Sequence, residues 1–230
     1  MASLLSPRLT PPVAPVRERR TVTAQAGDAF SPGMPMPSAE SKTMRLQSAL
    51  RDHGLNARSM LSISERETAA EKIADIVTHS SWFQRSKFVA CYLSVNSEVD
   101  TWSIIARAWA MKKRIFAPVI EKTSQMTFRE LSAESSLERD QYGIFAPRDG
   151  EFIDPRKLDI VLTPLVAFDA ENNRIGMGGG YFDRTFSFLK YRKSHFHPKL
   201  IGLGYACQKV DHIPPNRWDI RLYDVISESQ

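Results

Sequence analysis

Cysteine is scarce in this chain of 230 residues, which contains only Cys91 and Cys207. No CxxC pair and no cysteine–histidine spacing typical of zinc ligands is present, so the sequence excludes a disulfide framework and a zinc-binding module. Both thiols lie in apolar stretches. Reduced, buried cysteines of this kind are typical of a cytoplasmic protein, which is the location we expect.

Long apolar runs are also missing, and none approaches the roughly 20 residues that a membrane-spanning helix requires. The 31 Lys and Arg residues outnumber the 26 Asp and Glu residues, giving a formal charge of +5. This dilute excess favours anionic ligands in general, or a solvated surface without a partner, and no nucleic-acid-binding motif accompanies it. We therefore predict neither a membrane nor a nucleic acid as a partner.

Aromatic residues are almost absent from residues 1–43, where Phe30 is the only one, whereas seven of the chain's 14 prolines fall there. Without apolar periodicity, this composition predicts a disordered N-terminal extension. Its arginines leave targeting to an organelle open, and Met44 as the true first residue is a further alternative. The folded domain is predicted to span residues 44–230.

Beyond residue 43, helical and strand patterns alternate. Helical periodicity covers Leu46–Leu55, the segment after a capping box at Ser64–Glu67, Thr101–Met111 and Tyr181–Leu189; strand patterns cover Lys87–Ser94, Arg114–Ile120, Met126–Leu131, Asp159–Thr163, Lys199–Tyr205 and Leu222–Ile226. Met126–Leu131 alternates like an edge strand, and Val166–Phe168 is expected to extend the sheet. Strands separated by helices predict an α/β fold, here a single three-layer α/β/α domain with a mostly parallel, mixed sheet.

Glycine is concentrated between residues 176 and 180, where four of five positions are glycine. The run lies between a predicted strand and a predicted helix. Glycine adopts left-handed conformations without a side-chain clash, so successive N–H groups can curl around an anion, and the N-terminus of a helix adds positive potential. We interpret the run as a phosphate-binding loop; a tight connection without a ligand is the alternative.

Two better-known phosphate loops are excluded by residue identity. The dinucleotide-binding fingerprint G-x-G-x-x-G requires a sixth-position glycine, but Tyr181 stands there when counting from Gly176. The P-loop of nucleotide triphosphatases ends in Gly-Lys-Ser/Thr, whereas Gly180 is followed by Tyr181 and Phe182. The run is therefore a third type of glycine loop.

Asp183 lies three residues beyond Gly180, in the first turn of the predicted helix. The helix dipole alone favours a carboxylate at this position. Beside a phosphate-binding loop the same carboxylate suits Mg²⁺, which prefers one or two carboxylates plus phosphate oxygens and water. Arg174 and Arg184 flank the loop and offer charge to phosphate, although for Arg184 a surface or salt-bridge role is the favoured interpretation.

Residues 158–169 and 173–184 together closely resemble the signature of the 5-formyltetrahydrofolate cyclo-ligase (5,10-methenyltetrahydrofolate synthetase) family. Further similar segments bring the resemblance to about residues 45–228: Leu61–Arg66, Leu93–Ser94, Glu98–Thr101, Tyr142–Pro147, Gly204–Gln208, Ile213–Pro214 and Trp218–Asp219. Asn173, Phe182 and Ala146 depart from the family's usual residues, and Ser48 stands where a lysine is expected.

The resemblance implies an enzyme that uses MgATP to phosphorylate the formyl oxygen of 5-formyltetrahydrofolate. The N10 amine then closes onto the activated carbon, and phosphate leaves, so that the products are 5,10-methenyltetrahydrofolate, ADP and phosphate. Such a reaction depends on positioning and charge neutralisation more than on a protein nucleophile. The implied partners are these small molecules, and we expect a monomer. A reduced-folate-binding protein without turnover is the alternative function.

The same resemblance implies the site residues. Those for ATP are Arg51, Arg58, Arg174, Ile175, Gly176, Met177, Gly178, Gly179, Gly180, Tyr181 and Phe182. Those for the folate are Val95, Glu98, Asp100 and Tyr142, together with Met177, Gly178, Gly179, Gly180 and Tyr181. Mg²⁺ would be held by Asp183 and Asp219.

Several of these residues also have purely structural interpretations. Arg51 and Arg58 would suit the polar face of an amphipathic helix. Asp100, directly before a predicted helix, would suit an N-cap. Tyr142 would suit a core, and Asp219 a buried turn with a capping carboxylate. The sequence leaves these alternatives open.

Overall fold

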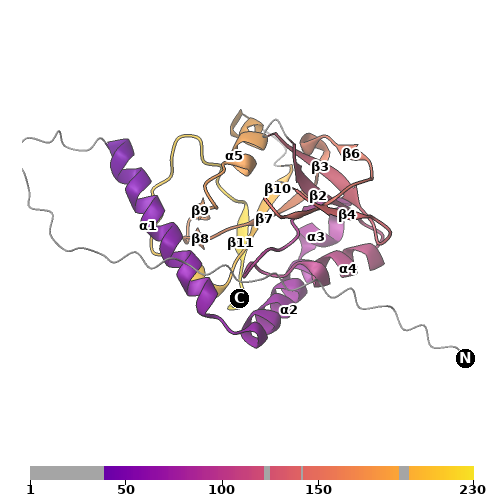
Figure 1. Cartoon of the computed structure of the whole chain (residues 1–230), viewed down its shortest axis with the longest axis horizontal. Coiled ribbons are helices and arrows are strands. Elements are labelled where there is room, and N and C mark those ends of the chain that lie inside the picture. The colour runs from indigo at the N-terminus through magenta and orange to yellow at the C-terminus, as the bar shows by residue number, and fades with distance from the viewer. Residues whose placement is uncertain (1–38, 122–124, 141, 192–196) are drawn as a thin grey trace, which may run out of the picture. The chain divides into compact units, whose positions relative to one another are not determined.

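Five parallel strands form the centre of the domain in the computed structural model, which describes residues 39–121, 125–140, 142–191 and 197–230 (Figure 1). The seven-stranded sheet has the order β11–β10–β7–β1–β2–β3–β6. Its strands are β1 (Phe88–Cys91), β2 (Arg114–Ile120), β3 (Met126–Leu131), β6 (Phe152–Ile153), β7 (Ile160–Pro164), β10 (Lys199–Leu203) and β11 (Asp224–Ile226). Strands β11, β10, β7, β1 and β2 run parallel, and β3 and β6 are added in antiparallel pairs.

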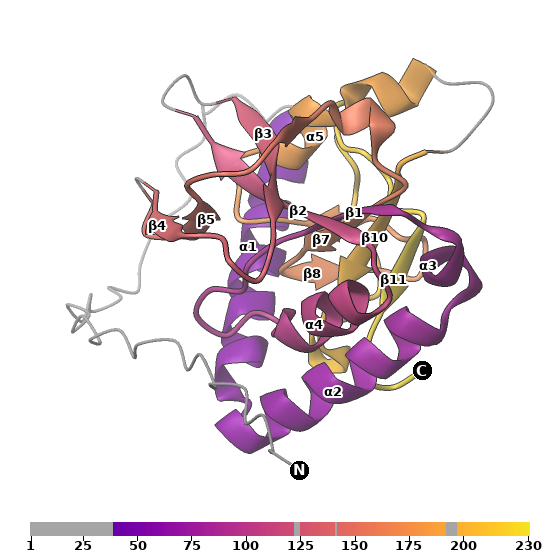
Figure 2. The ribbon, with the colours of Figure 1, turned by 90° about the vertical axis from the view of Figure 1, so that its right-hand side faces the viewer.

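Helices cover both faces of this sheet, which confirms the predicted α/β class (Figure 2). The helices α2 (Ile63–His79), α3 (Ser81–Arg85) and α4 (Trp102–Ala110) share one apolar cluster with inward-facing strand residues such as Val89. The short α5 (Tyr181–Thr185) and the 3₁₀ segment η2 (Ser187–Tyr191) cover the opposite face, where Ala90 belongs to a second cluster. Adjacent strand residues point to opposite faces, as the period of a strand requires.

Four local expectations are wrong in detail. The capping box of α2 is formed by Ser62 and Glu65, because the N-cap lies two residues before the predicted serine. Strand β3 is not an edge strand, since β6 pairs with its other side. The helix predicted over 181–189 ends at Thr185 and continues as 3₁₀ turns. Residues 166–168 do not extend the main sheet, because β8 (Ala167–Phe168) pairs with β9 (Arg174–Ile175) in a separate hairpin.

The turn of this β8–β9 hairpin is organised by Asp169. Its carboxylate accepts the main-chain N–H groups of Glu171, Asn173 and Ile213 and the side-chain amide of Asn173, all at 2.9–3.0 Å. Although burial disfavours the charged form, these bonds together hold the pKa of Asp169 below its usual value. A second small hairpin, of β4 (Leu137–Arg139) and β5 (Phe145–Pro147), lies elsewhere in the domain.

The first helix, α1 (Ala39–Met60), begins inside the segment predicted to be a disordered extension. The folded part therefore starts five residues before Met44, and the rest of that prediction concerns residues 1–38, which lie outside the described residues. Gly54 lets α1 approach the main chain closely: a Cβ at this position would lie 2.2 Å from the carbonyl oxygen of Val166. None of the helices described is long and apolar enough to cross a membrane.

The order of the strands indicates at which edge of the sheet a ligand is expected to bind. From β1 the chain moves to β2 on one side, and β7 later pairs on the other side of β1. In open α/β sheets, ligands bind outside the carboxyl ends of the strands at such a reversal of strand order. The loop after β1 carries Glu98, and the β8–β9 hairpin after β7 leads directly into the glycine loop.

The contact between Gly54 and Val166 generates a first prediction. Glycine to alanine in a helix normally stabilises by about 0.5–1 kcal/mol, but Gly54→Ala should destabilise the domain by about 1–3 kcal/mol because the new methyl group overlaps a carbonyl oxygen. Urea unfolding followed by circular dichroism measures the change. Asn56→Ala, on the exposed side of the same helix, is the matched control and should be neutral or stabilising. A Gly54→Ala protein as stable as the control would contradict the close approach.

Candidate active site

The glycine loop, residues 176–180, carries one side chain, that of the exposed Met177, and otherwise presents main chain to solvent. Gly178 and Gly180 have φ angles of +97° and +63°, in the region that L side chains rarely adopt. A Cβ added to Gly176 would meet no atom within 4 Å. The loop thus has the backbone conformation, and the open space beside it, that an anion-binding turn requires.

Arg51 connects the loop to helix α1. Its Nε donates to the carbonyl oxygen of Gly176 at 2.8 Å. The carbon at the centre of its guanidinium lies 3.8 Å from the point where a Cβ on Gly178 would stand. Among the described residues its two terminal nitrogens have no hydrogen-bond partner. Arg51 therefore holds the loop with one nitrogen and can offer two others to a bound anion.

The two flanking arginines are both engaged by other protein groups. Arg184 donates to the carbonyl oxygen of Gly179 at 2.8 Å and lies over the ring of Tyr181. Arg174, only 7 % exposed, donates to Oδ1 of Asp183 at 3.2 Å and to the carbonyl oxygen of Ile220 at 3.1 Å. Arg174 is thus a positioning residue for Asp183 in this structure.

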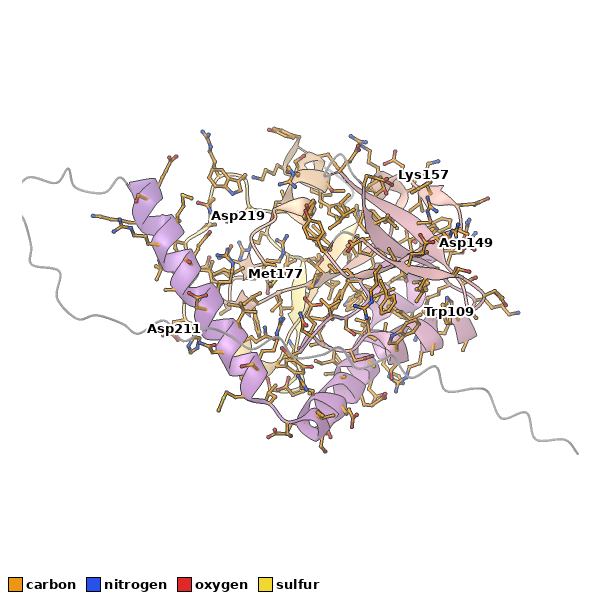
Figure 3. All side chains as sticks on the ribbon, in the orientation of Figure 1. Trp109, Asp149, Lys157, Met177, Asp211 and Asp219 are labelled. Carbon is orange, nitrogen blue, oxygen red and sulfur yellow. The ribbon has the colours of Figure 1, made fainter. Side chains whose placement is uncertain are left out.

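Asp183 also connects α5 to the chain segment that carries Asp219. Its Oδ1 accepts the main-chain N–H of Ile220 at 3.0 Å. Asp219 in turn accepts the N–H of Asn216 at 2.8 Å and the side-chain amide of Gln47, from α1, at 3.3 Å, both on Oδ2. These contacts bring both aspartates predicted for Mg²⁺ to the same part of the site. Figure 3 shows Asp219 and Met177 beside α1.

The two aspartates fit Mg²⁺ only as partial ligands. No group of three or more His, Cys, Asp or Glu residues able to hold a metal occurs in the described parts of the chain. Mg²⁺ does not require one, since it keeps several waters and binds through one or two carboxylates plus substrate phosphates. Asp183 Oδ2 and Asp219 Oδ1 have no hydrogen-bond partner among the described residues. Each aspartate therefore keeps one oxygen free next to the glycine loop.

Glu98 lies in the loop after β1 and is 10 % exposed at its side chain. Its Oε2 accepts the main-chain N–H of Val95 at 3.1 Å, so these two predicted folate residues form one turn. Burial raises the pKa of Glu98, while the bond from Val95 and the charge of Arg58 act in the opposite direction. The carboxylate is suited to accept N–H groups from a ligand when it is ionised.

Asp100 is not the N-cap of α4, which is Thr101, but it bonds to the first turn of that helix. Its Oδ1 accepts the main-chain N–H of Trp102 at 2.8 Å, at the start of α4. The neighbouring Thr101 is buried and donates instead to the carbonyl oxygen of Tyr92 at 2.7 Å. Asp100 is exposed, so a contact with substrate remains a prediction beside this observed hydrogen bond.

Tyr142 is not a core residue, because 56 % of it is exposed. Its hydroxyl forms a 2.6 Å hydrogen bond with the hydroxyl of Tyr181, and the two rings meet edge to face with centroids 6.2 Å apart. This bond raises the pKa of Tyr142. The pair connects the loop between β4 and β5 to the end of the glycine loop and provides aromatic surface beside it.

Other residues predicted from the sequence have different surroundings. The side chain of Ile175 is buried in an apolar cluster, so only its main chain is available to a ligand. The side chain of Phe182 packs against another cluster and is partly exposed. Arg58 does not join the glycine loop through any hydrogen bond among the described residues; it contacts Ser97 and Glu98.

The sequence interpretation missed two polar residues at the site, Gln47 and Asn216. Gln47 bonds to Asp219, to Asn216 and to the carbonyl oxygen of Pro214. Its position four residues before Arg51 places both on one face of α1, which is the sequence signal that could have identified it. Asn216 lies in an irregular segment and carries no comparable signal.

Comparisons with known proteins agree on one family. The sequence model of the 5-formyltetrahydrofolate cyclo-ligase family matches residues 43–228. The chain is 30 % identical over 173 residues to the 5-formyltetrahydrofolate cyclo-ligase of Haemophilus influenzae, covering 74 % of this chain and 90 % of that one. It is 35 % identical over 146 residues to that of Escherichia coli, covering 62 % and 78 %.

A solved structure supports the same relationship. The NMR structure of Aquifex aeolicus 5,10-methenyltetrahydrofolate synthetase superposes with a TM-score of 0.70 at 29 % sequence identity. The match covers 80 % of this chain and 91 % of the other. The family-model match, residues 43–228, includes all strands of the main sheet and the segments that carry the candidate site.

The geometry of the glycine loop leads to a second prediction. Gly178→Ala would place a methyl group at φ +97°, about 4 Å from the guanidinium of Arg51. We expect ATP affinity to fall about tenfold or more, because losing a charge-assisted hydrogen bond costs about 1.5–3 kcal/mol. Isothermal titration with a non-hydrolysable ATP analogue measures it. Gly150→Ala, at φ +102° away from the loop, is the control that should lower stability and leave ATP affinity unchanged. Unchanged affinity in Gly178→Ala would remove the loop from the nucleotide site.

Proposed function

The chain belongs to the 5-formyltetrahydrofolate cyclo-ligase family, and we propose that it converts 5-formyltetrahydrofolate to 5,10-methenyltetrahydrofolate with MgATP, releasing ADP and phosphate. Family membership makes the chain an ATP-dependent ligase. The observation that carries the detailed proposal is that helix α1 contributes to both ends of one site. Arg51 contacts the glycine loop, and Arg58 contacts the loop that carries Glu98.

The nucleotide end is assigned to the glycine loop and α1. Main-chain N–H groups of residues 176–180 and the free nitrogens of Arg51 receive the phosphates, since both are exposed donors next to each other. Arg174 supports this end through Asp183, and Ile175 and Phe182 contribute main chain. When bound, Mg²⁺ would be held by Asp183 and Asp219 and would neutralise charge on the phosphates.

The folate end is assigned to the loop after β1 and the tyrosine pair. Val95 and Glu98 form the turn that would accept N–H groups of the pterin ring, and Asp100 lies at its border. Tyr142 and Tyr181 offer ring surface to the flat parts of the substrate. Met177, exposed on the glycine loop between both ends, would contact the folate together with Gly178, Gly179 and Gly180.

The chemistry then requires alignment rather than a protein nucleophile. The formyl oxygen attacks the γ-phosphorus of ATP, and the bond to ADP breaks. The N10 amine attacks the formyl carbon, loses its proton, and the carbon–oxygen bond breaks with phosphate as the leaving group. Phosphate leaves readily where hydroxide would not, and fixed donors around the γ-phosphate stabilise the charge that develops. The monomeric state and the cytoplasmic location expected from the sequence stay predictions.

Mixing the full-length protein with ATP, Mg²⁺ and 5-formyltetrahydrofolate tests the proposed function. We expect the near-ultraviolet absorbance of 5,10-methenyltetrahydrofolate to grow in step with ADP release, because both products arise from one turnover. Omitting either substrate is the control and should abolish both signals. Folate binding without either signal would contradict the proposal and support the alternative of a non-catalytic reduced-folate-binding protein.

Asp183→Asn tests the metal assignment. Asparagine keeps an oxygen for Arg174 and Ile220 but removes the negative charge, so the fold should be retained while Mg²⁺ binds more weakly. We expect kcat to fall about tenfold or more and the Mg²⁺ concentration for half-maximal activity to rise, because a metal clamp on phosphate supplies several kcal/mol. Asp211→Asn, an exposed aspartate near the same segment, is the control. An unchanged Mg²⁺ titration in Asp183→Asn would exclude Asp183 as a ligand.

A further inference from the structure

Arg58 is an unusual residue of this site because it is a buried cation with incomplete hydrogen bonding. It is 4 % exposed, although it lies near the end of a helix whose neighbouring residues Ser59 and Met60 are exposed. Its Nε donates to the hydroxyl of Ser97 at 3.0 Å. Its Nη1 is buried and has no hydrogen-bond partner in the described part of the chain. The nearest acidic group is Oε1 of Glu98, 4.0 Å from Nη1.

This 4.0 Å separation is too long for a hydrogen bond but short for two opposite charges. Opposite charges at this distance attract one another strongly where water is largely excluded. Arg58 and Glu98 therefore interact through the attraction of their charges and not through a hydrogen bond. Oε1 of Glu98 remains unbonded among the described residues, and Oε2 is held by the N–H of Val95.

The other groups around Glu98 are hydroxyls that do not touch its carboxylate. Tyr205 donates to the main-chain carbonyl of Glu98 at 3.2 Å, and Tyr92 donates to that of Val99 at 3.1 Å. Burial raises the pKa of Tyr205 to about 12 and that of Tyr92 well above its ordinary value, so both phenols are neutral at physiological pH.

Three further charged groups act on Tyr205. The charges of Arg66, Asp100 and Glu228 act on the Tyr205 hydroxyl. The charge that acts on the Glu98 carboxyl itself is that of Arg58. The charge of Arg58 thus counteracts the rise in pKa that burial causes at the Glu98 carboxyl.

We propose that Arg58 is a positioning residue for the folate, whose buried guanidinium keeps the Glu98 carboxylate ionised and oriented to accept N–H groups of the substrate, and that it makes no contact with the nucleotide. The inference rests on the proposed function for the identity of the ligand. It changes the assignment that the family resemblance implied for Arg58. Arginine suits this role because it stays protonated even when buried, whereas a buried carboxylate without a countercharge takes up a proton.

Two of the three arginines of α1 then have separate roles. Arg51 and Arg58 are seven residues apart, about two turns or roughly 10 Å along one face of the helix. Arg51 contacts the glycine loop, and Arg58 contacts Ser97 and Glu98. Loss of each charge should therefore affect a different substrate.

The test compares Arg58→Met, which removes the charge, with the matched control Arg58→Lys, which keeps it. For Arg58→Met at pH 7 we expect KM for 5-formyltetrahydrofolate to rise about tenfold or more, because protonated Glu98 loses its charge-assisted bonds. KM for ATP should stay within about twofold of the wild-type value, and Arg58→Lys should lie close to wild type. Arg51→Met should give the opposite pattern, with KM for ATP raised.

The pH profile provides a measurement that a merely structural role would not change. Glu98 must be ionised to accept N–H groups, so kcat/KM for the folate falls as pH drops through its pKa. Removing the nearby cation moves this fall to higher pH in Arg58→Met, by about one unit or more. Glu98→Gln should remove this limb of the profile, and the double variant should bind folate no more weakly than Glu98→Gln alone.

Several outcomes would overturn the proposal. Equal increases in KM for ATP and for folate in Arg58→Met would show a nucleotide contact. A loss of activity without a shift of the pH profile would show a structural role. If Arg58→Met does not fold, unchanged folate binding in Glu98→Gln would also reject the proposal, since the charge that Arg58 protects would then not matter.

A direct measurement separates this inference from the proposed reaction. Carbon-13 NMR of glutamate side chains reports the pKa of Glu98, with Glu98→Gln providing the assignment. The pKa should be higher in Arg58→Met than in wild type whether or not methenyl-folate is formed. A wild-type protein without turnover but with this difference would reject only the proposed reaction, and an unchanged pKa would reject the role of Arg58.

Discussion

The structure depends most on the contact between Gly54 and the carbonyl oxygen of Val166. A side chain of any size at residue 54 would overlap this oxygen, which also accepts the amide of Gln208 at 2.7 Å. Because the contact fixes α1 against the segment after β7, three side chains of one helix reach three separate loops. Gln47 meets Asp219, Arg51 meets Gly176, and Arg58 meets Ser97. Any shift of α1 would weaken all three contacts together.

Most charged side chains near the glycine loop are used to hold one another. Arg174 and Arg184 donate hydrogen bonds to protein carbonyls, and Arg174 also donates to Asp183. Asp183 in turn accepts the N–H of Ile220. What remains for ligands is the main chain of the loop, two nitrogens of Arg51 and one oxygen on each aspartate. Such an arrangement is preorganised, because the groups that we propose to meet the substrate are already fixed by others before it binds.

The sequence predicted well what depends on short stretches of chain. Four glycines in five residues predicted a loop with left-handed conformations, and Gly178 and Gly180 have them. Apolar runs predicted the central strands, and the alternation of strands with helices predicted the fold class. The roles of the individual site residues in binding stay predictions.

What the sequence could not show are contacts between distant segments. Gln47 and Asp219 are 172 positions apart, and nothing near either residue indicates the other. Gly54 resembles an unfavourable helix residue until Val166 is seen beside it. The capping box was misplaced because Ser62 and Ser64 are each followed by glutamate three residues later, and local pattern alone does not choose between them.

The position of Gly54 between the two arginines has a mechanical consequence. Gly54 lies three residues after Arg51 and four before Arg58, so the helix meets the domain between its two site residues, roughly 5 Å from one and 6 Å from the other along the axis. A rotation of helix α1 about Gly54 would move the end that carries Arg51 and the end that carries Arg58 in opposite directions. Such a motion would change the contact of Arg51 with Gly176 and that of Arg58 with Ser97 together, without any change in the sheet.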